Sequence, residues 1–73
     1  MHTEPLSLQV LREQRGLSRD QLAEHASRSR RQVKDWELRV SAMGVDDCHA
    51  VSEAMGLFPA ERAALLAWAA VRP

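Results

Sequence analysis

The chemistry that this sequence best supports is the binding of an anion by the stretch SRSRRQVKDWE, residues 27–37. From residue 28 to residue 39, five Lys or Arg side chains accompany two carboxylates, a local excess of three positive charges. Over the whole chain, ten Lys and Arg balance ten Asp and Glu. Arginine suits phosphate oxygens and the major-groove edge of guanine, where its guanidinium can make two bonds at once. A short basic run is as often only a solvated helix face, so the position of this stretch in the fold must distinguish an anion-binding surface from such a face.

No other group of residues in the sequence has the composition of a catalytic or metal site. Within DDCH, residues 46–49, only Asp46 and His49 would share a helix face, and two ligands are too few to hold a metal. His2 and His25 have no evident partner, and no nucleophile is paired with a base. The sequence also lacks a glycine-rich phosphate loop, so we expect no enzyme activity, no metal and no cofactor.

The length and composition predict one soluble domain over residues 1–73. Hydrophobic residues make up 45% of the chain, but no run approaches the roughly 20 apolar residues of a membrane span. The opening residues MHTEPLS lack the basic and apolar segments of an export signal, and the single cysteine, Cys48, excludes an internal disulfide. We therefore expect a cytoplasmic protein without membrane association.

The elements that must position the basic stretch are helices. Glycine and proline occur only three times each, and an apolar period predicts a first helix over about residues 6–15. Two capping boxes follow eleven residues apart: Ser18 with Gln21, and Ser29 with Gln32. They start a second and a third helix at the next residue, which together form a helix-turn-helix over about residues 18–38. The composition is that of an all-α fold.

Two further helices are expected after the basic stretch. The first covers about residues 45–55, where Val45, Cys48, Val51 and Met55 are spaced as one apolar face. The second covers about residues 59–72, with its first position at a proline and its last turn at Arg72. The fold prediction is therefore a five-helix domain.

The third helix has two different faces. At about 100° per residue, Val33 and Trp36 point inward, and the outward side carries Arg30, Arg31, Lys34 and Asp35. Cations at a helix N-terminus oppose its dipole and cost about 0.3–1 kcal/mol each. An anionic partner reverses that sign, so the pattern indicates a surface that binds phosphate or reads base edges.

At this point the pattern resembles a known family. Residues Leu8 to about Leu66 resemble the lambda-repressor-like helix-turn-helix DNA-binding family, of the Cro and XRE type. The resemblance rests on LREQRGLSRDQLAEHA and RQVKDWE, and GLFPAERAALLAWA is similar to the fifth-helix segment of some members. It implies a compact five-helix lambda-repressor-like domain whose third helix enters the major groove of double-stranded DNA.

The resemblance also implies roles for single residues. The base-reading residues would be Arg30, Arg31, Lys34 and Asp35. The phosphate-contacting residues would be Arg19, Arg28, Ser29, Gln32 and Arg39. The turn departs from the family pattern, because Ser27 stands where glycine is usual and must adopt a positive φ. Arg28 stands where an apolar residue is usual, so its side chain must extend out of the helix junction.

The fifth helix suggests a second contact surface. Its large apolar side chains do not share one face, since Leu66 points one way while Leu65, Trp68 and Val71 spread over the opposite arc. Phe58 stands where the family usually has a capping Ser, and phenylalanine cannot cap. We expect these four residues, Phe58, Leu65, Trp68 and Val71, to form a homodimer interface; alternatively, Trp68 and Phe58 close the core.

Two functions from different classes follow from this reading. The first is a sequence-specific DNA-binding transcriptional regulator, repressor-like and homodimeric. The second is a protein-interaction module or antitoxin that uses the same fold to bind a partner protein. The neutral net charge and the departures at Ser27 and Arg28 support the second.

Overall fold

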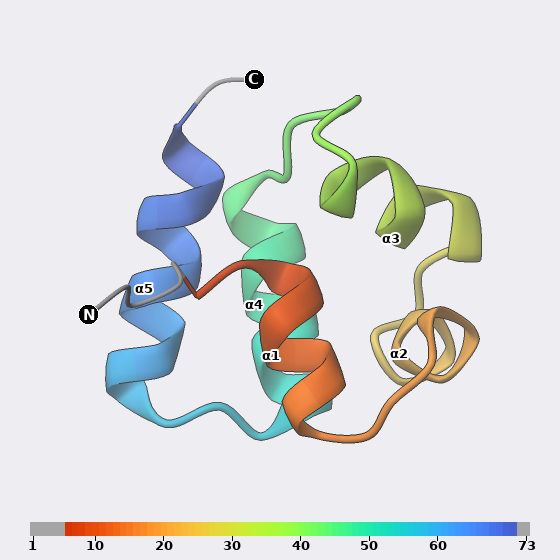
Figure 1. The fold of residues 1–73 in the computed structure, drawn as a ribbon, viewed down its shortest axis with the longest axis horizontal. Helices are drawn as coiled ribbons and strands as arrows, with labels where there is room; N and C mark the ends of the chain where they lie inside the picture. Colours follow the sequence, from red (N-terminus) through yellow and green to blue (C-terminus); the bar gives the residue numbers. More distant parts are fainter. Residues whose placement is uncertain (1–5, 72–73) are drawn as a thin grey trace.

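The computed structural model describes residues 6–71 as five helices, with no strand in that range (Figure 1). The helices are α1 (Leu8–Gln14), α2 (Arg19–His25), α3 (Arg30–Glu37), α4 (Val45–Met55) and α5 (Pro59–Ala70). The predicted all-α fold with five helices is confirmed. The first helix is shorter than predicted because Ser7 caps it, its Oγ accepting from the Val10 backbone N at 3.2 Å. Arg72, expected in the last turn of α5, lies outside the described residues.

The two predicted capping boxes set the starts of α2 and α3. In each box the Ser Oγ accepts from the Gln backbone N at 3.1 Å, and the Gln Oε1 accepts from the Ser backbone N at 2.8 Å before α2 and 2.9 Å before α3. Between these helices, Ser27 adopts the expected positive φ, at 55°. The backbone N of Arg28 then donates to the Ala23 carbonyl at 2.8 Å, which closes α2.

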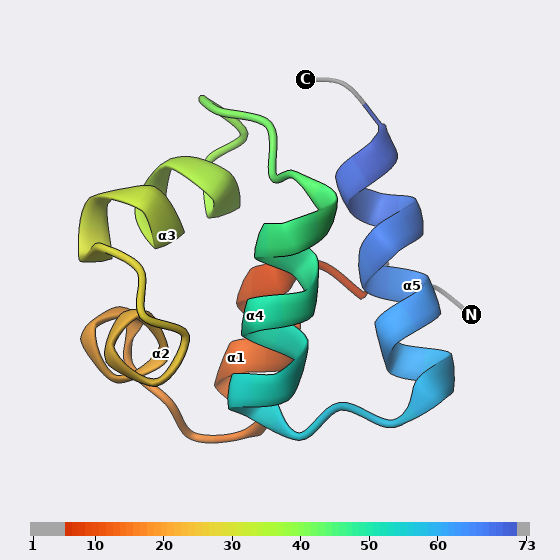
Figure 2. The same ribbon diagram turned by 180° about the vertical axis from the view of Figure 1, so that it is seen from behind.

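The helices are arranged around α4. In Figure 1 and in the reverse view of Figure 2, α5 lies on one side of α4, and α2 with α3 lies on the other, with α1 packed near the middle. α2 is seen nearly end-on while α3 runs across the view, so the axes of these two helices cross steeply. None of the helices within residues 6–71 has the length and apolarity needed to cross a membrane.

The core draws on every helix. Its fully buried side chains include Leu8, Leu11, Leu22, Val33, Val51 and Leu65. Val45 was predicted to join the apolar face of α4, and this is wrong: its side chain is 64% exposed, because the first residue of α4 lies beyond the edge of the core. Cys48 lies in the core, and burial together with the nearby charge of Asp47 raises the pKa of its thiol. That thiol is therefore poorly suited to nucleophilic chemistry.

Candidate nucleic-acid interface

The outer face of α3 carries three exposed cations. Arg30, Arg31 and Lys34 are exposed, while Val33 and Trp36 on the opposite face are buried. The Arg31 side chain is 91% exposed. The structure therefore presents the three predicted base-reading cations to solvent from one helix whose other face is anchored in the core.

Two carboxylates accompany these cations. Arg30 Nε lies 3.3 Å from Asp20 Oδ1 of α2, and Arg31 Nε lies 3.9 Å from Asp35 Oδ2 one turn further along α3. Asp35, predicted to read a base, is only partly exposed, and its backbone carbonyl accepts from the backbone N of Val40 at 2.9 Å. Among the described residues, Lys34 makes no ion pair within 4 Å.

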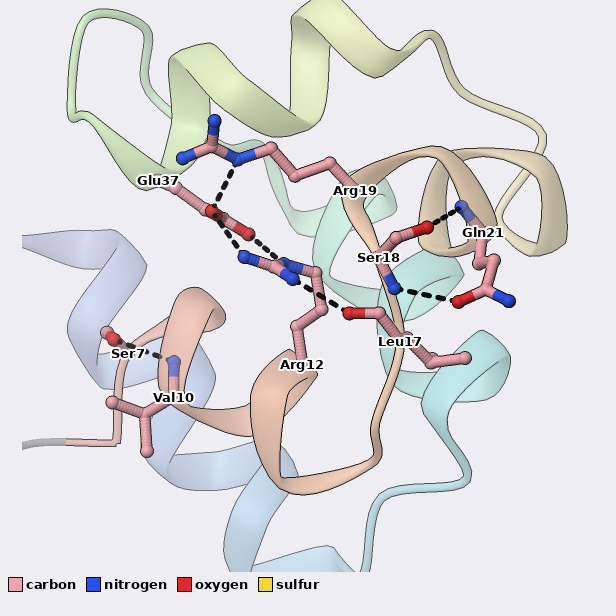
Figure 3. Close-up of polar contacts among 8 residues, drawn as sticks. All are labelled: Ser7, Val10, Arg12, Leu17, Ser18, Arg19, Gln21 and Glu37. Atoms are coloured by element: carbon pink, nitrogen blue, oxygen red, sulfur yellow. Dashed lines mark hydrogen bonds and ion pairs between the residues drawn. The ribbon is translucent and has the colours of Figure 1, made fainter.

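A buried carboxylate locks α3 to the two helices before it. Glu37, the last residue of α3, has a side chain with no solvent exposure. Its carboxylate accepts from Arg12 Nε at 2.6 Å, from Arg12 Nη2 at 3.2 Å and from Arg19 Nε at 2.9 Å (Figure 3). Arg12 also donates from Nη1 to the Leu17 carbonyl at 2.7 Å. The hydrogen bonds to Glu37 raise the pKa of Arg12 above its ordinary value.

Sequence reasoning assigned no role to Arg12 in this network. Arg12 and Glu37 are 25 residues apart, so helical periodicity gives no sign of their contact. The only available signal was the acidic residue directly after the buried Trp36. Two guanidinium groups around one carboxylate leave one excess positive charge where α1, α2 and α3 meet, which favours an anion at the surface nearby.

Arg19 remains compatible with the predicted contact to phosphate. Its Nε donates to Glu37, and its two terminal nitrogens donate no hydrogen bond within the described residues. Figure 3 shows the ion pair with Glu37 formed through Nε, with no bond drawn from either terminal nitrogen. Ser29 and Gln32 are exposed at the start of α3, and their capping bonds use the Ser hydroxyl and the Gln carbonyl oxygen, which leaves the Gln32 amide nitrogen for a partner.

Arg28 and Arg39, which were predicted to contact phosphate, have partners inside the protein, and their contact with phosphate stays a prediction. Arg28 Nε donates to Asp47 Oδ1 at 2.9 Å, which joins the turn to α4. Arg39 has a φ of 61°, and its guanidinium lies 4.5 Å from the ring centroid of Trp68. It also donates to the carbonyls of Trp68 and Val71 at the end of α5. Positive charge is favourable there because the last carbonyls of a helix are otherwise unpaired.

The predicted dimer surface on α5 needs one correction. Leu65 is fully buried in the core of the protomer, so its assignment to an interface was wrong. Leu66, which was placed on the arc opposite to Leu65, is partly exposed and lines shallow apolar hollows on the surface of α5. Adjacent positions on a helix differ by about 100°, and the face of α5 that packs against α4 is the one that carries Leu65.

The remaining interface residues do not form one patch. Phe58 is 72% exposed and Val71 is 63% exposed, but they flank the two ends of a helix that is about 18 Å long. Trp68 is partly buried beneath Arg39. Phe58 and Val71 are therefore separate candidates for contact with a second copy of the chain, and Phe58 is the one that lies away from Arg39.

Arg15 and Glu61 join α1 to α5, and this pair predicts a pH dependence of stability. Arg15 Nη2 donates to Glu61 Oε1 at 2.6 Å, and the backbone N of Phe58 donates to the same oxygen at 3.0 Å. These two bonds, that of Arg15 foremost, lower the pKa of Glu61. Because the pKa of Glu61 is lower in the folded than in the unfolded protein, the ionised carboxylate stabilises the fold at any pH above the unfolded pKa of about 4.3. This stabilisation is lost as the pH falls through the folded pKa.

We therefore expect the Glu61→Gln variant to lose less stability than the wild type between about pH 5 and pH 3. Urea denaturation followed by circular dichroism at pH 7, 5, 4 and 3 measures this difference. Glu13→Gln is the control, because Glu13 is exposed and forms no ion pair within the described residues. If the stabilities of the wild type and of Glu61→Gln fell equally with pH, Glu61 would not be the source of this pH dependence.

Among residues 6–71, no three His, Cys, Asp or Glu side chains come together in a way that could hold a metal. Comparisons with models of protein families, with curated proteins and with solved structures find no match for this chain.

Proposed function

We propose that this chain is a sequence-specific DNA-binding transcriptional regulator of the lambda-repressor-like class. In this proposal α2 and α3 act as a helix-turn-helix, and α3 enters the major groove. The observation that carries the proposal is the outer face of α3, where Arg30, Arg31 and Lys34 are exposed together on a helix anchored by buried residues. As a regulator of repressor type, it would work in the cytoplasm by occupying an operator.

The dimensions of α3 suit this role. Its eight residues span about 12 Å along the axis, and the major groove of B-DNA, about 12 Å wide, admits an α-helix of about 10–12 Å diameter. A free helix of this length is unstable in water, so its rigidity must come from the protein. Val33 and Trp36 bury one face of α3, and Glu37 fixes its end through Arg12 and Arg19. The proposed base-reading residues of α3 therefore lie on a helix that the rest of the protein holds in place.

The charges on α3 are easier to explain by binding than by stability. Arg30 and Arg31 are the first two residues of α3, where the helix dipole disfavours cations. Their ion pairs are exposed and 3.3 Å or longer, and such pairs add little stability. Binding of a DNA phosphate or a guanine edge would offset this cost, since the helix dipole and both guanidinium groups all attract such a ligand.

The proposal is tested by selecting duplexes that the protein retains from a random pool. We expect enrichment of one sequence, with guanines that match the cations of α3. Recovery of only random duplexes would refute sequence-specific binding. The rival function, a module or antitoxin that binds another protein, has support in the zero net charge and in the exposed Phe58, and it predicts no enrichment.

A homodimer with two-fold symmetry would place two copies of α3 on half-sites about one helical turn apart. We propose that Phe58 takes part in that contact, because it is an exposed large apolar side chain at the start of α5, away from Arg39. A phenylalanine at this position offers no acceptor for the first turn of α5, so it does not serve the helix itself.

Replacing Phe58 with Ser is therefore expected to dissociate the dimer and to stabilise each protomer by about 0.5–2 kcal/mol. Glu61 already accepts from the backbone N of residue 58, so a Ser hydroxyl would complete the capping box. Sedimentation equilibrium measures the mass, and urea denaturation of dilute protein measures the stability. Val40→Ser is the control, because Val40 is also exposed but lies after α3, and its mass should stay that of a dimer. A monomeric wild type, or a dimeric Phe58→Ser variant, would refute the interface.

A further inference from the structure

A carboxylate on α2 lies beside the first reading arginine of α3. Asp20 Oδ1 is 3.3 Å from Arg30 Nε, and both side chains are largely exposed, at 72% and 69%. Asp20 is the second residue of α2 and Arg30 the first residue of α3, so the contact spans the turn between the two helices. An exposed pair of this kind contributes little to folding.

Asp20 is close to Nε of Arg30, and this determines which nitrogens of Arg30 can still bind a ligand. Nε lies on one edge of the planar guanidinium, and the two terminal nitrogens are the donors furthest from the helix. A carboxylate that attracts Nε restricts the rotation of the long side chain and leaves both terminal nitrogens for a ligand. Guanine offers two acceptors on its major-groove edge, which match two such donors.

We propose that Asp20 is a positioning residue that orients Arg30 for a bidentate contact with guanine. This inference rests on the proposed function, because it requires α3 to lie in the major groove. Asp20 contributes in two ways that both increase selectivity. It holds Arg30 in the geometry that guanine needs, and its negative charge repels the phosphates of any duplex on which Arg30 has no guanine to bind.

Asp20→Asn tests the proposal with two duplexes: one enriched from a random pool, and one with the same bases in scrambled order. Ordering one flexible side chain in advance is worth about two- to tenfold in affinity. We therefore expect the affinity of the variant to fall by about that factor for the enriched duplex. Its affinity for the scrambled duplex should rise by about twofold, because one repulsive charge is removed. Changes of opposite sign on the two duplexes are the signature of positioning.

Two further variants separate this role from a general effect of charge. Glu24 lies one turn after Asp20 on the same face of α2, is exposed, and makes no ion pair within the described residues. Glu24→Gln should therefore raise or leave unchanged both affinities. When Arg30 is already replaced by Ala, Asp20→Asn should no longer weaken binding to the enriched duplex, because the side chain that it orients is gone.

Each alternative outcome overturns the proposal. A rise in both affinities would make Asp20 a source of repulsion only, and an equal fall in both would make it structural. No change in either would make the Asp20 and Arg30 pair a solvated contact without function. These results leave the proposed function intact, whereas failure to enrich any duplex with the wild-type protein would refute both.

Discussion

Replacing Glu37 with Gln should destabilise the protein by about 3–5 kcal/mol. The carboxylate of Glu37 is completely buried and accepts three hydrogen bonds from Arg12 and Arg19. Glutamine has a similar size but no charge, so the buried guanidinium of Arg12 would lose its compensation. A 73-residue domain has a total stability of only about 4–11 kcal/mol, so this single change should bring the chain close to unfolding.

Urea denaturation followed by circular dichroism measures this loss. Glu24→Gln is the matched control, because it makes the same substitution at an exposed carboxylate, and it should change the stability by less than about 0.5 kcal/mol. Replacing Arg12 with Met and Glu37 with Leu together should recover much of the loss, since apolar residues can replace a buried ion pair. A Glu37→Gln variant as stable as the wild type would show that this network does not hold α3.

The double substitution Arg30→Ala with Arg31→Ala should reduce the affinity for the enriched duplex by at least about 30-fold. Each bidentate contact between arginine and guanine contributes about 1–3 kcal/mol, and the change removes both candidate residues. Their side chains are exposed, so the fold should persist with an unchanged circular dichroism spectrum. Fluorescence anisotropy of the labelled duplex measures the affinity.

A cation on another surface provides the control. Arg62 belongs to α5, which lies on the far side of α4 from α3 in both views (Figures 1 and 2). Arg62→Ala should change the affinity for DNA by less than about threefold, as expected for one distant charge. Equal losses from α5 and α3 would mean that charge alone, and not the face of α3, determines binding.

The parts of the fold that depend on local sequence were predictable. The two capping boxes placed the starts of α2 and α3 correctly, because both halves of a box lie within four residues. The outward and inward faces of α3 followed in the same way from the helical period. For Arg30, Arg31 and Lys34 the structure agrees with the predicted exposure.

The parts that depend on packing between distant segments were not predictable. Leu65 and Leu66 are neighbours of the same residue type, and only contact with α4 decides which one is buried. Arg12 finds Glu37 across 25 residues, and Arg39 finds Trp68 across 29. Such contacts arise only when the fold is complete, so no pattern along the chain indicated that the guanidinium of Arg39, assigned to phosphate by the family resemblance, also contacts the end of α5.

The most direct test of the central claim is the affinity of the wild-type protein for the enriched and the scrambled duplex as the salt concentration rises. We predict at least about 100-fold tighter binding to the enriched duplex at moderate salt. The affinity should fall as salt rises, with a logarithmic slope of about −2 to −4 per protomer, since Arg19 and the cations of α3 neutralise a few phosphates. Equal affinities for the two duplexes, or binding that does not respond to salt, would contradict the reading of DNA by α3.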